Sequence, residues 1–260
     1  LACTLAYLAA KRARRIAAAS FFTALTDFAH PGELGVFIDE EQLAAMDQMM
    51  AKRGYLEGRE MATTFNMLRA NDLIWSFVVN NYLLGKEPFP FDLLYWNSDS
   101  TRMPYAMHSF YLHKFYQENK LIEPGGITLC DVAIDLRKIR LPIYMLSTRE
   151  DHIAPWATTY AATQLYRGDT KFVLAGSGHI AGVVNPPTQQ KYGYWTNDRL
   201  PPDPEDWLDG ATEHPGSWWP DWAAWNAGKS GPRVPTRQPG DGKLELLEDA
   251  PGTYARIRAV

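Results

Sequence analysis

Two residues that could act together in catalysis, Asp151 and His179, each follow an apolar run of the sequence. Residues 141–151 (LPIYMLSTRED) end in a charged cluster that contains Asp151, and residues 170–179 (TKFVLAGSGH) lead through small residues to His179. If both runs are neighbouring parallel strands, their carboxyl ends meet at one edge of a sheet, where the chemistry of such sheets takes place. A carboxylate there can orient an imidazole, which then takes the proton of a nucleophile. The spacing therefore predicts an acid–base pair.

Other interpretations of these residues are open at this point. Asp151 could cap a helix before Pro155, because carboxylates are favoured at that position, and His179 could be a loop histidine with a structural role. His152 competes as the base, but a direct neighbour of the acid normally points elsewhere. A metal site made of Asp151, His152 and His179 lacks a further ligand at metal spacing. Because the acid and the histidine close consecutive strands, we favour catalysis and expect neither a metal nor a cofactor.

The order acid, then histidine, is that of an α/β-hydrolase triad, in which the nucleophile comes first. That nucleophile sits on a strained turn with glycines two residues to either side. Cys3 lacks these glycines, and we expect it to be a helix residue packed in the core. Ser177 has adjacent glycines at the wrong spacing and lies only two residues before His179. Since a helix at the start of the chain would directly follow such a turn, we expect the nucleophile to lie upstream of residue 1.

Three further segments supply the frame for the pair. Residues 1–13 (LACTLAYLAAKRA) are rich in Ala and Leu and hold no Gly or Pro, which favours a helix. Residues 16–28 (IAAASFFTALTDF) are mostly apolar, as is typical of a strand buried on both faces. Residues 156–168 (WATTYAATQLYRG) have helical composition, with Gly168 as a C-cap. Because this helix separates the two apolar runs, the sequence predicts a parallel strand–helix–strand unit.

The region from 28 to 135 differs in composition and holds no convincing parallel-strand repeat. It is rich in aromatic residues and Met, and residues 71–85 and 104–120 have helical patterns. We therefore predict an α/β-hydrolase fold, with a doubly wound, mostly parallel sheet in residues 1–27 and 136–260. Residues 28–135 form a mainly helical cap inserted into this core.

The composition excludes several classes of protein. Of the 260 residues, 46% are hydrophobic, which is enough for one domain with a full core. A net charge of -4 without a dominant basic patch argues against a nucleic-acid partner. The two cysteines are far apart, which fits a reducing cytoplasm better than a disulfide framework, and no apolar run approaches the length of a membrane span. The tail after Asn185 is dense in Pro and Trp and should pack over the core surface.

Several blocks of sequence together resemble one known family. The blocks are TDFAHPGELGVFIDEEQ, NDLIWSFVVNNYLLG, FDLLYWNSDSTRMP, STREDHIAPW, SGHIAGVVNPP and GSWWPDWAAW. They resemble the C-terminal catalytic domain of class I poly(3-hydroxyalkanoate) synthases, the polymerases that make poly(3-hydroxybutyrate), and the resemblance runs from residue 1 almost to Val260. In that family the nucleophile is a cysteine in a lipase-like Gly-x-Cys-x-Gly-Gly box. LACTLAYLAAKR resembles the helix directly after the box, so this chain is identified as a member that is truncated just after it.

The resemblance implies an acyltransferase that polymerises (R)-3-hydroxyacyl-CoA of short chain length, such as 3-hydroxybutyryl-CoA, with release of CoA. Asp151 matches the acid and His179 the base of a Cys-His-Asp acyl transfer. Without the box the chain lacks the nucleophile and the oxyanion-hole amide that follows it, so we expect it to be inactive alone. The implied partners are the growing polyester, the surface of cytoplasmic polymer granules and a second subunit, bound through the cap.

A polymerase of this kind must exclude water, which would otherwise hydrolyse the acyl-enzyme. Aromatic residues of the cap could line a dry path, although core packing explains most of them individually. They are Trp75, Phe77, Tyr82, Phe89, Phe91, Tyr95 and Trp96.

Two other functions stay open. The first is a different α/β-hydrolase, such as a thioesterase, a lipase or a polyester depolymerase, because the fold does not determine the function. The second is a non-catalytic fragment that is associated with polymer granules.

Overall fold

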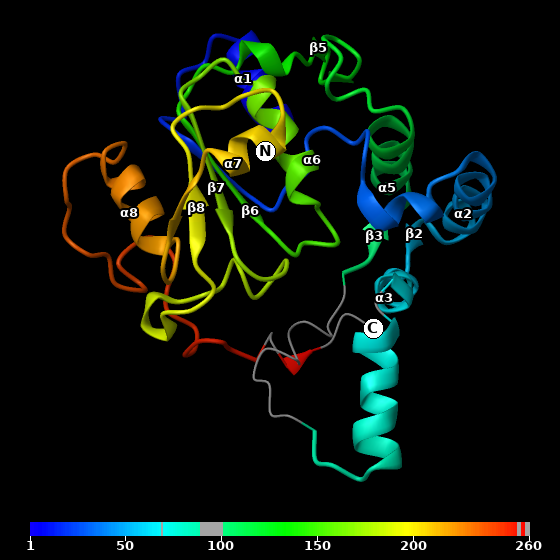
Figure 1. The fold of residues 1–260 in the computed structure, drawn as a ribbon. Coiled ribbons are helices and arrows are strands. Elements are labelled where there is room, and N and C mark those ends of the chain that lie inside the picture. The colour runs from blue at the N-terminus through cyan, green and yellow to red at the C-terminus, as the bar shows by residue number, and fades with distance from the viewer. Residues whose placement is uncertain (69, 89–100, 254–255, 258–260) are drawn as a thin grey trace. The chain divides into compact units, whose positions relative to one another are not determined.

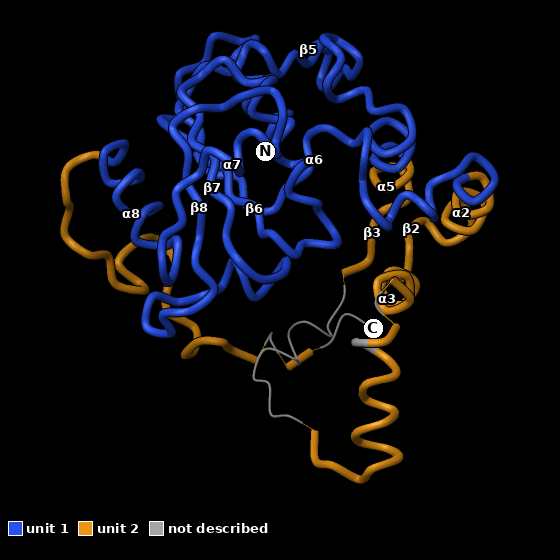
Figure 2. Tube along the Cα trace, viewed as in Figure 1, with its two compact units in different colours: residues 1–43, 110–230 blue, residues 44–109, 231–260 orange. Residues whose placement is uncertain are grey.

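The computed structural model describes residues 1–68, 70–88, 101–253 and 256–257. The chain divides into two compact units, coloured separately in Figure 2. Unit 1 comprises residues 1–43 and 110–230, and unit 2 comprises residues 44–109 and 231–260. The cap boundaries at 28 and 135 stay a prediction. Four cap aromatics lie outside the described residues, namely Phe89, Phe91, Tyr95 and Trp96.

In its described part, unit 1 is built on a five-stranded sheet (Figure 1). In spatial order its strands are β1 (Ala19–Phe22), β6 (Ile143–Thr148), β7 (Thr170–Ala175), β8 (Tyr194–Thr196) and β9 (Thr212–His214). β1, β6 and β7 run parallel, with Met145 of β6 paired to Phe21 on one side and Phe172 on the other. β8 and β9 continue the sheet antiparallel. The predicted parallel frame is confirmed, and the carboxyl ends of β6 and β7 are neighbours.

The end strand β1 differs from its neighbour β6 in burial. All six residues of β6 are buried, and the first four of them, at 143–146, form a continuous apolar run, as is typical of a strand covered on both faces. In β1 only Ala19 and Phe21 are buried, and Phe22 is 36% exposed. The expectation that this strand is buried on both faces was wrong, because in the described sheet β1 is an end strand that pairs with β6 alone.

Helices cover both faces of the sheet, as a doubly wound fold requires (Figure 1). Met145 and Phe172 lie in the larger core cluster, together with residues of α1 (Ala2–Ala10), α6 (Trp156–Ala161) and α7 (Pro204–Asp209). Tyr144 and Val173 point to the opposite face, where they pack with Trp218 and with residues of α8 (Trp219–Ala227). This alternation follows from the two-residue period of a strand.

Both predicted helices of unit 1 are present, although each is shorter than expected. α1 confirms a helix within residues 1–13, and it ends at Ala10, two residues before Arg12, whose φ of 54° is left-handed. The α-helical part of 156–168 ends at Ala161, and a short 3₁₀ turn, η6 (Ala162–Gln164), follows. Gly168 is therefore not a C-cap. A Cβ at Gly168 would lie 2.0 Å from the carbonyl oxygen of Leu141, so glycine lets the chain pass close to the start of β6.

The Trp-rich tail does more than cover the core surface. Its residues form β8 and β9, which extend the sheet, and these strands were not predicted because each spans only three residues. Trp207 of α7 is fully buried, with its ring centroid 4.8 Å from that of Phe172. Part of the tail thus belongs to the core itself.

Within unit 2, most of the elements in the described part of residues 44–109 are helical, whereas residues 231–253 form neither a helix nor a strand. Residues 71–85 form two π-helical segments, η2 (Asn71–Trp75) and η3 (Val78–Leu83), after α3 (Gly58–Leu68). A short antiparallel pair joins β2 (Tyr55–Leu56) to β3 (Met103–Pro104). Three of the cap aromatics are exposed, with exposed fractions of 57% for Trp75, 51% for Phe77 and 84% for Tyr82.

The remaining elements along the chain are short, apart from one helix. They are η1 (Gly32–Phe37), α2 (Glu40–Arg53), α5 (Tyr105–Tyr111), η4 (Leu112–Gln117), β4 (Thr128–Leu129), β5 (Val132–Ala133), η5 (Leu136–Lys138) and η7 (Pro187–Gln189). α5 and η4 together confirm the helical pattern at 104–120. In the described part of the chain, no helix is both long and apolar enough to cross a membrane.

Candidate active site

The turn after β6 presents Asp151 as an acceptor of several hydrogen bonds. Asp151 Oδ1 accepts from the backbone N–H of Ile153 at 2.9 Å and of Ala154 at 2.8 Å. Asp151 Oδ2 accepts from Thr148 Oγ1 at 3.3 Å. The alternative role as a helix cap does not hold, because the N-cap of α6 is Pro155 and Asp151 instead closes its own turn. The residues of this turn therefore fix the position of the carboxylate.

The turn after β7 presents His179 on a backbone that is packed too closely for a side chain at two of its positions, Gly176 and Gly182. A Cβ at Gly176 would lie 2.2 Å from the carbonyl oxygen of Tyr192, and a Cβ at Gly182 would lie 2.5 Å from Thr148 Cγ2. Ser177 between them has a left-handed φ of 74°. The chain can therefore fold back sharply at the end of β7, which brings His179 to the turn that follows β6.

The two predicted residues are in direct contact. His179 Nδ1 lies 2.8 Å from Asp151 Oδ2, the side chain of Asp151 is fully buried, and the side chain of His179 is 28% exposed. Burial by itself opposes the charge on Asp151. The hydrogen bonds from His179, Ala154 and Ile153 outweigh this effect and hold the pKa of Asp151 below its ordinary value. An ionised Asp151 favours the His179 tautomer with the proton on Nδ1, which leaves Nε2 to exchange protons.

The residues rejected as nucleophiles are not in the position that a nucleophile needs. Cys3 lies within α1, and burial of its thiol raises its pKa, against a smaller opposing effect of the N-terminal charge. The raised pKa disfavours the thiolate, which is the reactive form. The other thiol, Cys130, is exposed in the turn between β4 and β5, and neither cysteine forms a disulfide. His179, the histidine favoured in the prediction, supplies an imidazole that contacts Asp151.

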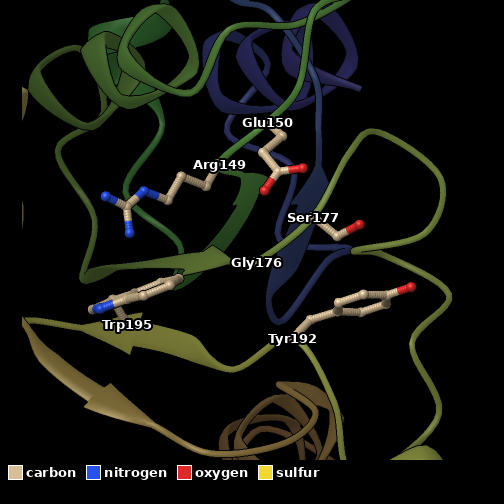
Figure 3. Close-up of a pocket in the computed structure, with 6 residues that line it drawn as sticks. All are labelled: Arg149, Glu150, Gly176, Ser177, Tyr192 and Trp195. Atoms are coloured by element: carbon tan, nitrogen blue, oxygen red, sulfur yellow. The ribbon is translucent and has the colours of Figure 1, made fainter. Parts of the chain in front are cut away.

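A cavity of about 460 Å³ lies beside the two turns (Figure 3). It is lined by Arg149, Glu150, Gly176, Ser177, Tyr192 and Trp195. The guanidinium of Arg149 lies over the ring of Trp195, 5.0 Å from its centroid. Sequence reasoning missed this cavity because Tyr192 and Trp195 come from β8 and the segment before it, which was not predicted. Sequence reasoning also missed Thr148, which donates to Asp151. Its position three residues before Asp151 could have indicated this hydrogen bond.

Comparison with known proteins identifies the fold family and the relatives of this chain. A family described as "alpha/beta hydrolase fold" matches residues 2–186. The chain is 54% identical over 260 residues to the poly(3-hydroxyalkanoate) polymerase of Methylorubrum extorquens. The match covers 100% of this chain and 43% of that protein. It is 51% identical over 259 residues to the poly(3-hydroxyalkanoate) polymerase subunit PhaC of Rhizobium meliloti, covering 100% of this chain and 42% of the relative.

A third relative, the poly(3-hydroxyalkanoate) polymerase subunit PhaC of Cupriavidus necator, is 46% identical over 261 residues, which cover 98% of this chain and 44% of that protein. The chain thus spans less than half the length of the relatives that it matches. The match to the fold family, by contrast, extends over most of the chain and includes both Asp151 and His179. The chain belongs to the α/β-hydrolase fold family and is homologous, over its whole length, to poly(3-hydroxyalkanoate) polymerases.

Proposed function

We propose that this chain carries the acid and the base of a polymerase that joins (R)-3-hydroxyacyl groups from their CoA thioesters into a polyester. The observation that carries the proposal is the 2.8 Å contact between His179 Nδ1 and Asp151 Oδ2, made between turns that follow neighbouring parallel strands. The whole-length homology to poly(3-hydroxyalkanoate) polymerases supports the choice of reaction. Short acyl chains, such as 3-hydroxybutyryl, are the proposed substrates.

The proposed reaction is a covalent acyl transfer in two halves. A cysteine thiol gives its proton to His179 Nε2 and its sulfur attacks the thioester carbonyl, so that a C–S bond to the enzyme forms and the bond to CoA breaks. The departing CoA sulfur takes the proton from His179. The 3-hydroxyl of the next acyl group then gives its proton to Nε2 as its oxygen attacks the acyl-enzyme, and the cysteine sulfur leaves and takes this proton from the imidazolium. The chain grows by one ester bond, and Asp151 stabilises the imidazolium in both halves.

The nucleophile is the part of this reaction that residues 1–260 do not supply. The sequence contains Cys3 and Cys130 only, the first inside a helix and the second in a hairpin turn. We place the nucleophilic cysteine in the part of the polymerase that this chain does not cover, and we expect residues 1–260 by themselves to release no CoA.

The surroundings of the reaction are proposed from composition and resemblance. Residues 28–135 act as the cap that keeps water from the acyl-enzyme, with exposed aromatic side chains such as Trp75 and Tyr82 available to line an apolar path. The cap also joins two subunits, and the polymer remains attached at the surface of a cytoplasmic granule. A chain that released CoA without making polymer would instead be a thioesterase.

The experiment replaces the matching segment of the M. extorquens polymerase with this chain. The chimaera should release CoA from 3-hydroxybutyryl-CoA and form polymer, because the chain covers that segment completely at 54% identity. Both products are measured, free thiol by a colour reaction and polymer by gas chromatography after methanolysis.

Two controls make the result specific to the pair. His30→Gln changes an exposed histidine of the same unit and should leave turnover unchanged. Cys3→Ser should also retain polymerisation, since Cys3 is placed in a helix rather than at the reacting centre. A chimaera that folds but only hydrolyses the thioester would contradict the proposed polymerase.

A further inference from the structure

The segment Ser217–Trp219, at the start of α8, contacts the turn that carries His179. Trp218 Nε1 donates to the carbonyl oxygen of Gly182 at 3.0 Å and lies 3.2 Å from that of Val183. Trp219 Nε1 donates to the carbonyl of Val183 at 2.9 Å, and Ser217 Oγ donates to the carbonyl of Asn185 at 2.6 Å. Three consecutive side chains thus donate to three backbone carbonyls of one turn.

We propose that Trp218 is a positioning residue for His179. By donating to the backbone carbonyl of Gly182, Trp218 keeps His179 at hydrogen-bonding distance from Asp151. The indole does not touch either member of the pair in this arrangement; it acts on the backbone that carries the imidazole. The catalytic consequence rests on the proposed function, whereas the positioning itself is a property of the fold.

The path from Trp218 to the acid–base pair is short. The backbone N–H of Gly182 donates to the carbonyl of Gly178 at 2.9 Å, so this hydrogen bond joins the residue before His179 to the third residue after it. Gly182 also lies so close to the methyl group of Thr148 that a Cβ would clash at 2.5 Å. Thr148 in turn donates to Asp151. Gly182 is therefore held between the indole on one side and the end of β6 on the other, and its displacement would move His179 relative to Asp151.

The indole is itself firmly held. Trp218 is 3% exposed, with its ring centroid 5.1 Å from that of Phe22 and 6.2 Å from that of Trp222. α8 is anchored to the face of the sheet by Asp221, which accepts from Tyr144 Oη at 2.9 Å and forms an ion pair with Lys171 at 2.6 Å. A donor on such a rigid support can fix the position of the turn relative to the sheet, which the local backbone bonds within the turn do not determine.

Apolar packing alone would not require tryptophan at this position. A phenylalanine could fill much of the same space between Phe22 and Trp222, but the carbonyl of Gly182 would lose its indole donor, whereas the carbonyl of Val183 would keep Trp219 Nε1. A buried carbonyl that loses its donor is destabilised, and a turn with that freedom can adopt other positions. The N–H group, rather than the ring, is therefore the part of Trp218 that the proposal concerns.

The test compares Trp218→Phe with Trp222→Phe in the chain of residues 1–260. Trp222 is the matched control, because it lies in the same cluster and its Nε1 donates to Ser20 Oγ at 2.9 Å instead of to the turn. Nuclear magnetic resonance follows the exchange of the backbone amides of Gly182 and Val184 and of the proton on His179 Nδ1. In Trp218→Phe these protons should exchange about tenfold faster, the change expected for one lost hydrogen bond. In Trp222→Phe they should exchange as in the unchanged chain.

Either of two results would overturn the proposal. The first is a folded Trp218→Phe variant whose turn and His179 proton are unaffected, and the second is an equal effect of Trp222→Phe, which would indicate general loosening of the cluster. If Trp218→Phe does not fold, Trp219→Phe takes its place, since Trp219 is 39% exposed and donates to the same turn. An unchanged turn in Trp219→Phe would then count against the proposal.

A kinetic measurement in the chimaera separates this inference from the proposed function. Trp218→Phe should lower kcat about tenfold or more with KM changed less than about twofold, because a misplaced base affects the reaction more than substrate binding. Normal kcat in a variant whose turn is loosened would refute the positioning role. A different result would show that the proposed function is wrong: the His179→Gln chimaera would remain fully active.

Discussion

The turn after β6 and the turn after β7 present the two partners of the pair in different ways. Asp151 stabilises its own turn, because its carboxylate accepts from Ile153 and Ala154 within three residues along the chain. The local hydrogen bonds of the His179 turn join backbone groups instead: the N–H of Gly182 donates to the carbonyl of Gly178, and those of Val183 and Val184 donate to the carbonyl of Ile180. This turn also depends on glycines that allow close approach and on donors from Ser217–Trp219, more than thirty residues further along the chain.

The difference follows from the chemistry of the two side chains. A carboxylate must be buried to hold an imidazole firmly, and a buried carboxylate needs several donors, which the adjacent backbone supplies at the lowest entropic cost. The imidazole must instead keep one nitrogen open to the substrate, so its own turn cannot enclose it. Fixing the imidazole from behind, through its backbone, leaves Nε2 accessible.

The largest expected effect comes from removing each partner in the active chimaera. His179→Gln should lower turnover about 10³-fold or more, because both halves of the reaction pass a proton through Nε2. Asp151→Asn should cost about 10²-fold, since the imidazole stays in place but loses the charge that orients it. CoA release by purified variants, checked by circular dichroism, measures both. Equal and small losses would mean that neither turn presents a reacting group.

The His179 turn should not tolerate an added methyl group at Gly182. In Gly182→Ala the new Cβ would meet Thr148 Cγ2 and the carbonyl of Gly176, both at 2.5 Å, so we expect a loss of about 1–3 kcal/mol in the free energy of unfolding. Gly35→Ala is the matched control, because its Cβ would lie 3.5 Å from Pro31, an ordinary contact. Urea denaturation of the chain gives both values. If the two variants were equally stable, the close packing of the His179 turn would not matter.

The contribution of Asp151 to the free energy of unfolding should depend on pH. The pKa of Asp151 is lower in the folded chain than its ordinary value of 3.8, so the ionised carboxylate stabilises the fold above that value. This contribution is lost as the pH falls through the folded-state pKa. The difference in unfolding free energy between the chain and Asp151→Asn should therefore be constant from pH 7 to about pH 5 and shrink below about pH 4. If this difference in unfolding free energy grew towards acid pH, the pKa of Asp151 would be raised rather than lowered in the folded chain, and the prediction would be wrong.

The sequence was informative wherever neighbours along the chain decide the structure. The parallel strands, α1 and the positions of Asp151 and His179 at strand ends followed from apolar runs and helix-forming composition. β8 and β9 did not, because a three-residue strand carries too little pattern, and its pairing is decided by distant residues such as Leu174. The contact of Trp218 with Gly182 was invisible for the same reason, since the indole N–H could donate to any carbonyl.

The smallest effect should come from the outermost donor to the His179 turn. Ser217→Ala removes the bond from Ser217 Oγ to the carbonyl of Asn185, and with it the acceptor for the backbone N–H of Trp219. Because Ser217 is only 7% exposed, water cannot fully replace these bonds, and we expect a loss of about 1 kcal/mol in unfolding free energy. Ser230→Ala is the matched control: its hydroxyl also donates to a backbone carbonyl, that of Asn226, but at an exposed site.

The control should change stability by less than about 0.5 kcal/mol. Ser217→Ala should also speed amide exchange in the His179 turn while exchange in the Asp151 turn stays unchanged, which is the contrast between the two turns in its most direct form. Faster exchange of Ile153 and Ala154 in the same variant would mean that the turns are supported jointly. The acid and the base would then share one scaffold, and the external support would not be specific to the histidine.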